Sequence, residues 1–530
     1  MQWTTEQQAI LAHAATGAPG KVLAYAGTGK TTTLTGIAEA LAGRRVLYLA
    51  FNRVTAQEAQ ARFPAHVTAK TAHALAFAAT RAWRGYRPLE GSWWRLRQAL
   101  ASTFPDTARG ADGQPTAWFE RTESQVFQIV AGTLAHYCQS ADSLVLPRHV
   151  PADGIAPIVA AYLQPGWDER TTRQFAEEVR SRFAALAQRA WDALLARADW
   201  PITHDVYLKV WQLSHPALPA DVVLFDEAQD ANPVMQDLVL QHAGPVWMVG
   251  DSYQAIYAWR GAVDALDQFP APAFPLSQSW RFGPAVAATA GEILDRLWQA
   301  APPLTGLGPP GRVLGAGPAS TTDPGYRPVT DRDQEAVICR TNIGVFMAAV
   351  AHLQAGDAVA VAGGADDIAS LIESAVALYR GGRARHRDLR DFATWDDLEA
   401  ISDTELGQQY RPIVRLVRQE PDFAARAAVA LRTETVPESA ARVVVSTGHK
   451  AKGRQWPGVR LADDWRAFVG VHETGEPWVL PEEARLWYVA LTRAQRHLDL
   501  TAVGGAWNDF REWPGPTATV TDHGVTGRGA

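Results

Sequence analysis

A short glycine-rich segment near the start of the chain has the residue types that bind phosphate. It follows an apolar run, Lys21 to Tyr25, and precedes sequence of helix-forming composition. In that context the backbone N–H groups of a glycine turn can surround phosphate oxygens, which favours a phosphate loop over a merely flexible one. We expect Lys30 to reach the β and γ phosphates of ATP and the Thr31 hydroxyl to bind Mg²⁺. The residues assigned to this nucleotide site are Ala26, Gly27, Thr28, Gly29, Lys30, Thr31 and Thr32.

A second apolar run, Val222 to Phe225, ends in two adjacent carboxylates. Asp226 has the chemistry to hold Mg²⁺, usually through water, and Glu227 can take the proton from an attacking water. Acidic residues after a strand also occur as solvated groups or helix caps, so the pair alone supports both interpretations. Together with the phosphate loop, it predicts hydrolysis of ATP.

Apolar runs of strand length recur in two sets and end in polar residues, as buried parallel strands do. They predict two α/β domains with parallel sheets. The first set contains four runs: Lys21 to Tyr25, Val46 to Phe51, Val222 to Phe225 and Val246 to Val249. The second set contains Ala336 to Cys339, Ala358 to Ala362, Arg442 to Val445, Val459 to Ala462 and His497 to Val503.

Helical spacing replaces strand spacing in two places. The first is residues 81–201, where Phe175, Val179, Phe183, Leu186 and Trp191 follow one helix face. The second is a basic and then amphipathic stretch from Leu378 to Arg432. Pro, Gly and Ser cluster from Ala301 to Thr330, which predicts a surface loop.

Composition sets limits on partners and location. With 530 residues and roughly 150 per domain, three or four domains are expected. The net charge of −6 gives no global attraction to nucleic acid, so DNA binding would need a local groove. The 2 cysteines, Cys138 and Cys339, are too few for a disulfide framework. No membrane span or signal peptide is evident, which predicts a cytoplasmic protein, associated with the nucleoid if bacterial.

Several segments in sequence order resemble the motifs of superfamily 1 DNA helicases of the UvrD/Rep/PcrA group. The resemblance spans residues 7 to 494, almost the whole chain, and implies two RecA-like motor domains of the P-loop NTPase class. The matching segments are Gln7 (Q motif), Phe51 and Asn52 (Ia), Thr71 to Ala76 (Ib), Phe225 to Asp230 (II), Val249 to Ala262 (III), Gln278 to Arg281 (IV), Thr447 to Gly453 (V) and Tyr488 to Ala494 (VI).

The resemblance implies further roles at the nucleotide. Arg281 and Arg493 match arginine fingers of the family, which are worth roughly 10³ to 10⁵ in turnover. Gln254 and Arg260 match residues that sense the γ-phosphate. Gln7 and Trp280 match residues that contact adenine.

Two positions depart from the family pattern. Thr32 stands where many members have an arginine that faces adenine, and Gln455 stands where they have a glutamate that contacts the ribose. Selectivity for the base and for the ribose is therefore in question.

The resemblance also assigns contacts to single-stranded DNA, because the motifs contain aromatic residues that stack on bases. Without the motifs, packing in a core would be the usual role of such aromatics. Arg81 to Arg97 and Arg380 to Arg390 are further basic segments; the first is equally compatible with a packed helix, and the second favours a solvated face. The residues assigned to DNA are Phe51, Asn52, Thr71, His73, Tyr257, Trp259 and His449.

The expected domain division follows the motifs. Residues 1–80 and 202–275 form the first RecA-like domain, with 81–201 as a helical insertion. Residues 276–375 and 436–530 form the second, with 376–435 as a small accessory insertion. Gln278 to Gly283 and Ser446 to Trp465 most resemble the F-box DNA helicase branch, although no F-box is expected before Gln7.

The expected enzyme is an ATP-dependent 3′ to 5′ DNA helicase and single-stranded DNA translocase in repair, recombination or replication. Its polarity comes from the resemblance alone. Single-stranded and tailed duplex DNA are the expected partners. One alternative is a translocase that strips recombinase filaments or assists a nuclease partner with little unwinding. The other is a nucleotide-gated DNA-binding module that hydrolyses little.

Overall fold

The computed structural model describes residues 3–81, 123–196, 202–258, 261–316, 321–330, 332–390, 392–402, 410–472, 476–515, 519–521 and 524–526. By its internal contacts the chain forms two compact units, and each is described separately. The first unit contains Met1–Leu23 and Thr31–Phe274, and the second contains Ala24–Lys30 and Pro275–Ala530. The glycine-rich loop therefore groups with the second unit, although the strand before it and most of the helix after it belong to the first.

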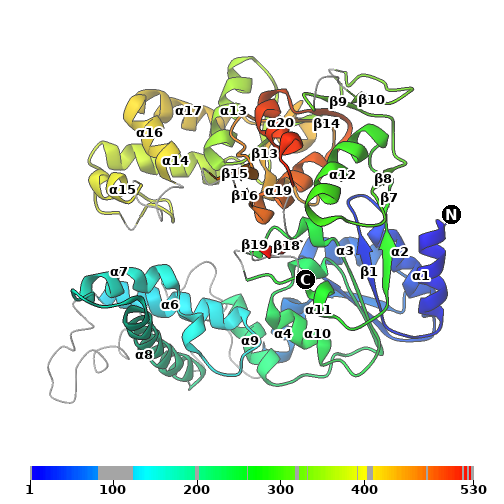
Figure 1. Cartoon of the computed structure of the whole chain (residues 1–530), viewed down its shortest axis with the longest axis horizontal. Helices are drawn as coiled ribbons and strands as arrows, with labels where there is room; N and C mark the ends of the chain where they lie inside the picture. Colours follow the sequence, from blue (N-terminus) through cyan, green and yellow to red (C-terminus); the bar gives the residue numbers. More distant parts are fainter. Residues whose placement is uncertain are drawn as a thin grey trace. The chain divides into compact units, whose positions relative to one another are not determined.

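The first unit is built on a sheet with the strand order β3-β2-β4-β5-β1-β6. Its strand β1 is drawn in blue in Figure 1. β2 pairs in parallel with β3 and β4, and β5 pairs in parallel with β4 and β1. Every residue of β2, β4 and β5 is buried, as expected for parallel strands covered on both faces. The strands are β1 (Gly20–Ala24), β2 (Val46–Ala50), β3 (Val67–Thr71), β4 (Val222–Phe225), β5 (Val246–Gly250) and β6 (Ala273–Leu276).

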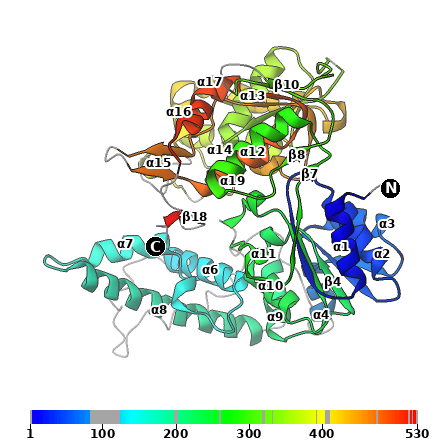
Figure 2. The same cartoon turned by 45° about the vertical axis from the view of Figure 1, so that its right-hand side comes forward.

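The helices of the first unit follow these strands or pack beside them. The expected helical face lies in α8 (Glu169–Ala196), where Val179, Phe183, Leu186 and Trp191 are buried. α6, α7 and α8 lie against one another (Figure 2) and share a continuous apolar core with α9 and with β2, β4 and β5. The other helices are α1 (Thr5–Ala15), α2 (Lys30–Ala40), α3 (Arg53–Arg62), α4 (Ala72–Arg81), α6 (Glu123–Gln139), α7 (Ala152–Tyr162), α9 (His204–Leu213), α10 (Pro233–Leu240) and α11 (Ala265–Gln268), with short 3-10 helices η2 (Pro147–His149), η3 (Ala228–Asp230) and η4 (Ser252–Gln254).

The second unit contains a sheet with the order β10-β9-β17-β14-β11-β13-β12. Its neighbouring strands pair in parallel, except that β10 pairs antiparallel with β9. The two sheets confirm the α/β class with parallel sheets. The strands are β9 (Arg312–Leu314), β10 (Thr321–Thr322), β11 (Glu335–Cys339), β12 (Val359–Val361), β13 (Val443–Thr447), β14 (Trp456–Leu461) and β17 (Ala494–Asp499); the small two-stranded pairs are β7 (Gln278–Ser279) with β8 (Thr305–Gly306), β15 (Val469–Val471) with β16 (Pro477–Val479), and β18 (Thr519–Thr521) with β19 (Gly524–Thr526).

Helix α17 (Pro421–Glu434), which falls in the expected accessory region 376–435, contributes to the apolar core of the second unit. α14 and α17 contact each other, and both belong to one apolar core with α13, β11, β12 and β13. The helices of this unit are α12 (Pro284–Trp298), α13 (Asn342–Gln354), α14 (Asp366–Tyr379), α15 (Trp395–Ser402), α16 (Arg411–Gln419), α17 (Pro421–Glu434), α18 (Gly448–Ala451), α19 (Pro481–Leu491) and α20 (Gly504–Glu512), with η7 (Glu438–Ala440) and η8 (Thr501–Val503).

Two expectations about this unit were wrong. The segment Ala301 to Thr330 is not only a surface loop, because it contains β8, β9 and β10. Its backbone is held by hydrogen bonds from Thr305 N to Ser277 O (2.9 Å) and from Leu307 N to Ser279 O (2.7 Å). The last expected strand, His497 to Val503, instead runs from Ala494 to Asp499, because β17 pairs with β14 from its first residue.

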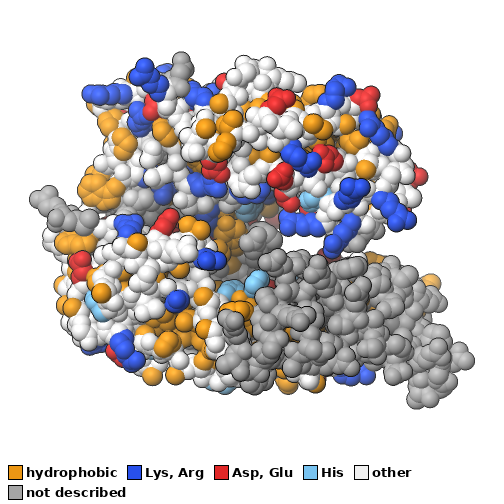
Figure 3. Space-filling model, turned by 180° about the vertical axis from the view of Figure 1, so that it is seen from behind, with side chains coloured by type: hydrophobic (Ala, Val, Ile, Leu, Met, Phe, Trp, Pro, Cys, Tyr) orange, Lys and Arg blue, Asp and Glu red, His pale blue; other side chains and the backbone are white. Residues whose placement is uncertain are grey.

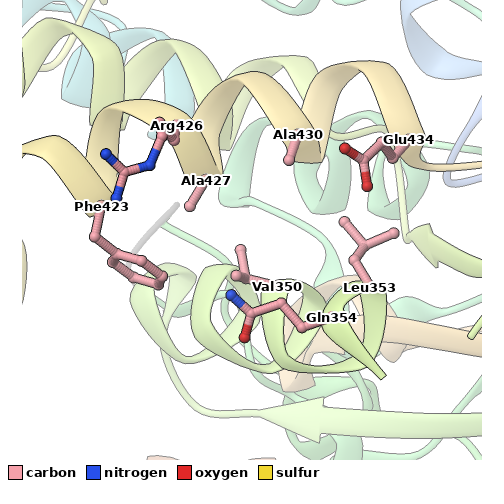
Figure 4. A pocket seen from close by; sticks show the side chains of 8 residues that line it. All are labelled: Val350, Leu353, Gln354, Phe423, Arg426, Ala427, Ala430 and Glu434. Atoms are coloured by element: carbon pink, nitrogen blue, oxygen red, sulfur yellow. The ribbon is translucent and has the colours of Figure 1, made fainter. Parts of the chain in front are cut away.

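A groove of about 280 Å³ lies between α13 and α17 (Figure 4). Val350 and Leu353 form its apolar floor, and Arg426 and Glu434 stand on α17 at its rim. It contains none of the residues assigned to nucleotide or DNA, so it has no part in the candidate site.

The two cysteines, the surface charges and the apolarity of the helices can be compared with what the composition predicts. Cys138 and Cys339 are buried free thiols, and burial raises the pKa of both, as expected for inert packing residues. On the face drawn in Figure 3, basic side chains recur with acidic ones between them. Within the described part of the chain, no helix combines the length and apolarity needed to cross a bilayer.

One buried charge in the helical region gives a test of this packing. Lys209 of α9 is 0% exposed, and its Nζ donates to the carbonyl oxygens of Ser140 and Asp142 and to Gln212 Oε1. Burial lowers the pKa of Lys209 to about 8. Between that pH and the ordinary value of 10.5, the unfolded chain binds a proton that the folded chain does not, so stability should rise with pH.

We therefore predict that the difference in unfolding free energy between wild type and Lys209→Met increases from pH 8 to pH 10.5. The expected increase is on the order of 3 kcal/mol, from a shift of between two and three pKa units. Urea unfolding of both proteins across this range measures it. Taking the difference cancels the titration of other groups, and a difference that stays flat would contradict the lowered pKa of Lys209.

Candidate active site

The glycine-rich loop connects β1 to α2 through backbone angles that suit glycine. Gly27 has φ of 76° and Gly29 of 82°, in the left-handed region that other residues avoid. The Thr28 hydroxyl donates to Tyr25 O at 2.8 Å and closes the turn from inside. Lys30 is the first residue of α2, so the loop ends at a helix N-terminus, where backbone N–H groups favour an anion.

The loop is packed against residues of motifs IV and VI within the second unit. Trp280 N–H donates to Gly27 O at 2.9 Å, and Ala26 N–H donates to Tyr488 Oη at 3.1 Å. A β-carbon at Gly27 would lie 2.6 Å from both Arg281 Cβ and Ser279 Oγ. Gly27 is therefore required for close approach as well as for its backbone angle.

The expected metal ligands lie in the first unit. Thr31 is in the first turn of α2, and Asp226 follows β4 with 5% of its surface exposed. Asp226 Oδ1 accepts from Glu227 N–H at 2.9 Å, and Oδ2 accepts from the Tyr48 hydroxyl at 2.5 Å. A hydroxyl and a carboxylate, completed by water and nucleotide phosphates, are the oxygen donors that Mg²⁺ prefers, so the residues fit this ion. No cluster of three or more His, Cys, Asp or Glu side chains suited to a metal occurs among the described residues.

Glu227, the expected base, stands on a strained backbone. Its φ of 52° and ψ of 42° are left-handed, a conformation that costs a non-glycine residue about 1–2 kcal/mol. The hydrogen bond from its N–H to Asp226 holds this turn.

A chain of hydrogen bonds connects Glu227 to motif III. Gln229 Nε2 donates to Glu227 Oε2, and Gln229 Oε1 accepts from Asp251 N–H at 3.0 Å. Asp251 Oδ2 in turn accepts from Gln254 Nε2. Gln229, Asp251 and Gln254 are all buried, so these bonds form away from water. Gln229 and Asp251 were missed as site residues, since neither type signals a bridging role by itself.

Two of the residues assigned to DNA are brought together in the first unit. Phe51 follows β2, Tyr257 follows η4, and their rings stack with centroids 6.0 Å apart and planes 8° apart. Phe51 is 37% exposed, which is unusual for a phenylalanine and leaves surface for a base. Trp259 and Arg260 lie outside the described residues.

Two of the other residues assigned to DNA, Asn52 and Thr71, make hydrogen bonds to backbone groups nearby in the sequence. Asn52 caps α3 by accepting from Thr55 N–H, and the Thr71 hydroxyl accepts from Ala74 N–H at the start of α4. His73 lies on α4 with Nε2 3.6 Å from Asp205 Oδ1. His449 lies on α18 in the second unit.

The adenine candidates occupy different settings. Gln7 is 5% exposed; its Oε1 accepts from Thr4 N–H in the capping box of α1, and its Nε2 donates to the Thr33 hydroxyl at 3.1 Å. Trp280 is 52% exposed, and its backbone is bonded to the loop. Thr32 lies in α2, beyond the loop.

The two candidate arginine fingers are both held by hydrogen bonds within the second unit. Arg281 Nε donates to Gln455 Oε1 at 2.9 Å, and its Nη1 donates to Thr492 O at 3.0 Å. Arg493 is 1% exposed, with Nε donating to Val489 O at 2.8 Å. Gln455, expected at the ribose, thus also contacts Arg281, and its neutral amide leaves the guanidinium charge uncompensated by this neighbour.

A buried carboxylate supports the motif IV segment. Asp323 accepts from Ala285 N–H, in the first turn of α12, and from Gly311 N–H at 2.8 Å. Gly308 runs so close to this segment that a β-carbon there would lie 2.4 Å from Phe282 N. No signal in the sequence points to Asp323, because it acts across 38 residues.

The two basic segments provide no described contact that favours DNA binding. Beyond Arg81, the segment Arg81 to Arg97 lies outside the described residues. In the second segment, Arg380 pairs with Asp422 and Arg387 with Asp367, all on exposed side chains. This pairing is typical of a solvated face.

Two protein-family models match parts of the chain. Residues 7–260 match the AAA domain family, and residues 381–504 match the UvrD-like helicase C-terminal domain. The chain is similar to F-box DNA helicase 1 of Gallus gallus, with 29% identity over 93% of this chain and 48% of that protein. It is also similar to F-box DNA helicase protein 1 of Schizosaccharomyces pombe, with 28% identity over 91% and 56%.

A more distant relative is ATP-dependent DNA helicase UvrD2 of Mycobacterium tuberculosis, with 26% identity over 91% of this chain and 76% of that protein. Among solved structures, that of PRRSV helicase aligns at a TM-score of 0.28 with 11% identity over 93% of this chain and 54% of that one, too weak a likeness to carry an argument. The chain spans about half the length of the F-box relatives. The two family matches, in this order along the chain and with these relatives, make the chain similar to the UvrD-like superfamily 1 helicases, close to the F-box DNA helicase branch.

Proposed function

We propose that the chain is an ATP-dependent DNA helicase that moves along single-stranded DNA, with Mg²⁺ as the metal and a 3′ to 5′ direction. The observation that supports it most is the hydrogen-bonded chain from Glu227 through Gln229 and Asp251 to Gln254. Gln254 ends η4, which leads directly to Tyr257 of the stacked aromatic pair. The group expected to activate water is thereby connected to the group expected to hold a base.

Each group of residues at the proposed nucleotide site has a defined chemical task. Lys30 and the loop N–H groups bind the phosphates, Asp226 and Thr31 hold the metal, and Glu227 takes a proton from water. The Mg²⁺ ion, when bound, neutralises the charge that develops on the phosphates. Arg281 and Arg493 supply further positive charge to the γ-phosphate.

The polarity and the substrates rest on the family resemblance. The relatives are named as DNA helicases, which supports DNA as the polymer. We also propose that the chain acts on single-stranded and tailed duplex DNA in the cytoplasm. The alternative is a translocase that strips recombinase filaments or assists a nuclease partner with little unwinding.

The first prediction from the proposed function concerns the Gln229 amide, which bridges motifs II and III. Gln229→Leu removes the bond to Glu227 and misplaces the carboxylate, so kcat of the DNA-stimulated ATPase should fall roughly 10²-fold. The KM for ATP should stay within about 2-fold, because the loop and metal ligands are untouched. Steady-state ATPase assays with saturating single-stranded DNA measure both. Gln188→Leu, which removes a hydrogen-bonded glutamine in α8, is the control, and an equal loss in both variants would contradict the bridging role.

The second prediction concerns the stacked pair. Phe51→Ala or Tyr257→Ala should weaken binding of single-stranded DNA by about 1–3 kcal/mol, since stacking on a base is lost. The double variant should lose less than the sum, because the rings contact each other. Fluorescence anisotropy with labelled oligonucleotides measures this, with Tyr379→Ala as an exposed aromatic control. Unchanged DNA affinity would return both rings to a packing role.

The third prediction tests the activity as a whole. With ATP and Mg²⁺, the chain should displace the strand of a duplex carrying a 3′ single-stranded tail and leave a 5′-tailed duplex intact. Lys30→Ala should remove both displacement and DNA-stimulated hydrolysis. Displacement from the 5′ tail would reverse the polarity, hydrolysis without displacement would favour the stripping or accessory role, and ATPase that ignores DNA would refute the motor.

A further inference from the structure

One polar atom interrupts an otherwise apolar central strand. The residues of β2 are Val46, Leu47, Tyr48, Leu49 and Ala50, all buried, and Tyr48 is 0% exposed. A hydroxyl taken out of water and left without a partner costs about 1–3 kcal/mol. Phenylalanine would fill the same space without that cost, so the hydroxyl at this position needs an explanation.

The partner of that hydroxyl is the expected metal ligand. Tyr48 Oη donates to Asp226 Oδ2 at 2.5 Å, a short distance typical of a bond to a charged acceptor. Asp226 Oδ1 is bonded at the same time by Glu227 N–H at 2.9 Å. With a donor on each oxygen, the carboxylate cannot turn about its Cβ–Cγ bond without breaking one of them.

Both residues are placed by the sheet and by packing. β2 and β4 pair in parallel with Tyr48 opposite Leu224, so the phenol reaches toward the residue that follows β4. The Tyr48 ring packs on Phe63, with centroids 4.9 Å apart. A phenol keeps its proton at neutral pH, so the Tyr48 hydroxyl can donate to the carboxylate.

We propose that Tyr48 is a positioning residue for the divalent cation, and that its hydroxyl fixes the Asp226 carboxylate in the orientation that receives the Mg²⁺ of Mg·ATP. The inference rests on the proposed function, in which Asp226 holds that ion. A carboxylate has about four lone-pair sites, so it can accept both bonds and still bind a metal-bound water. Groups that orient a metal ligand typically change metal affinity or activity by about 10- to 100-fold when removed.

The purely structural alternative makes a different prediction. If Tyr48 only fills the core, losing its hydroxyl lowers stability but leaves the effect of Mg²⁺ on nucleotide binding unchanged. If it positions Asp226, the loss falls on the Mg²⁺-dependent part of nucleotide affinity.

The test is Tyr48→Phe, which keeps the ring and removes one oxygen. Binding of a fluorescent N-methylanthraniloyl ATP is titrated in excess Mg²⁺ and in EDTA, so the readout is affinity and not turnover. The affinity in EDTA should stay within about 2-fold, while the tightening caused by Mg²⁺ should fall about 10-fold or more. Tyr137→Phe is the matched control, since Tyr137 is also 0% exposed and its hydroxyl donates to Ser143 O at 3.0 Å in the helical region.

A double-mutant cycle shows whether the hydroxyl acts through Asp226. In an Asp226→Asn background, Tyr48→Phe should change the Mg²⁺ effect by less than about 2-fold, because its target has been altered. An equal effect in both backgrounds, or equal losses in EDTA and Mg²⁺, would overturn the inference. Thermal unfolding of each variant verifies that the fold is retained.

The outcomes separate this inference from the proposed function. A wild-type protein whose nucleotide affinity does not respond to Mg²⁺ would contradict the proposed function itself. A wild type that responds, with Tyr48→Phe responding equally, would contradict only the role of Tyr48.

Discussion

The parallel pairing of β2, β4 and β5 is the constraint on which the candidate site of the first unit depends. Parallel strands end at the same edge of a sheet, so Phe51, Asp226 and Asp251, which follow these strands, are brought to one edge. The register also sets which side chains face each other. A slip of one residue would turn Tyr48 to the opposite face of β2 and remove the donor from Asp226.

Hydrogen bonds at that edge of the sheet connect Glu227, which follows β4, with Asp251 and Gln254, which follow β5. Gln229 uses both ends of its amide, donating to Glu227 and accepting from Asp251, and Gln254 continues the chain. Gln229, Asp251 and Gln254 are buried, so water competes little for the hydrogen bonds between them.

Sequence patterns predicted the parts of the fold that depend on local periodicity. The buried strands read as apolar runs and α8 as a repeating apolar face, and both formed as predicted. The segment Ala301 to Thr330 failed because its composition indicates a loop, whereas its strands are held by distant partners. Gly308 is needed there for close contact with Phe282, a reason that composition does not reveal.

By itself the sequence determined which residues have the types needed for chemistry, namely the glycine loop with Lys30 and the carboxylates after β4, and which family their order resembles. Local residue types and spacing are sufficient for that, because the loop and the acidic pair are short motifs whose chemistry lies in consecutive residues. Only the tertiary structure decided what holds those residues in place. Tyr48, Gln229 and Asp323 are ordinary in sequence, and they matter because strand register and helix packing bring a buried donor or acceptor to each.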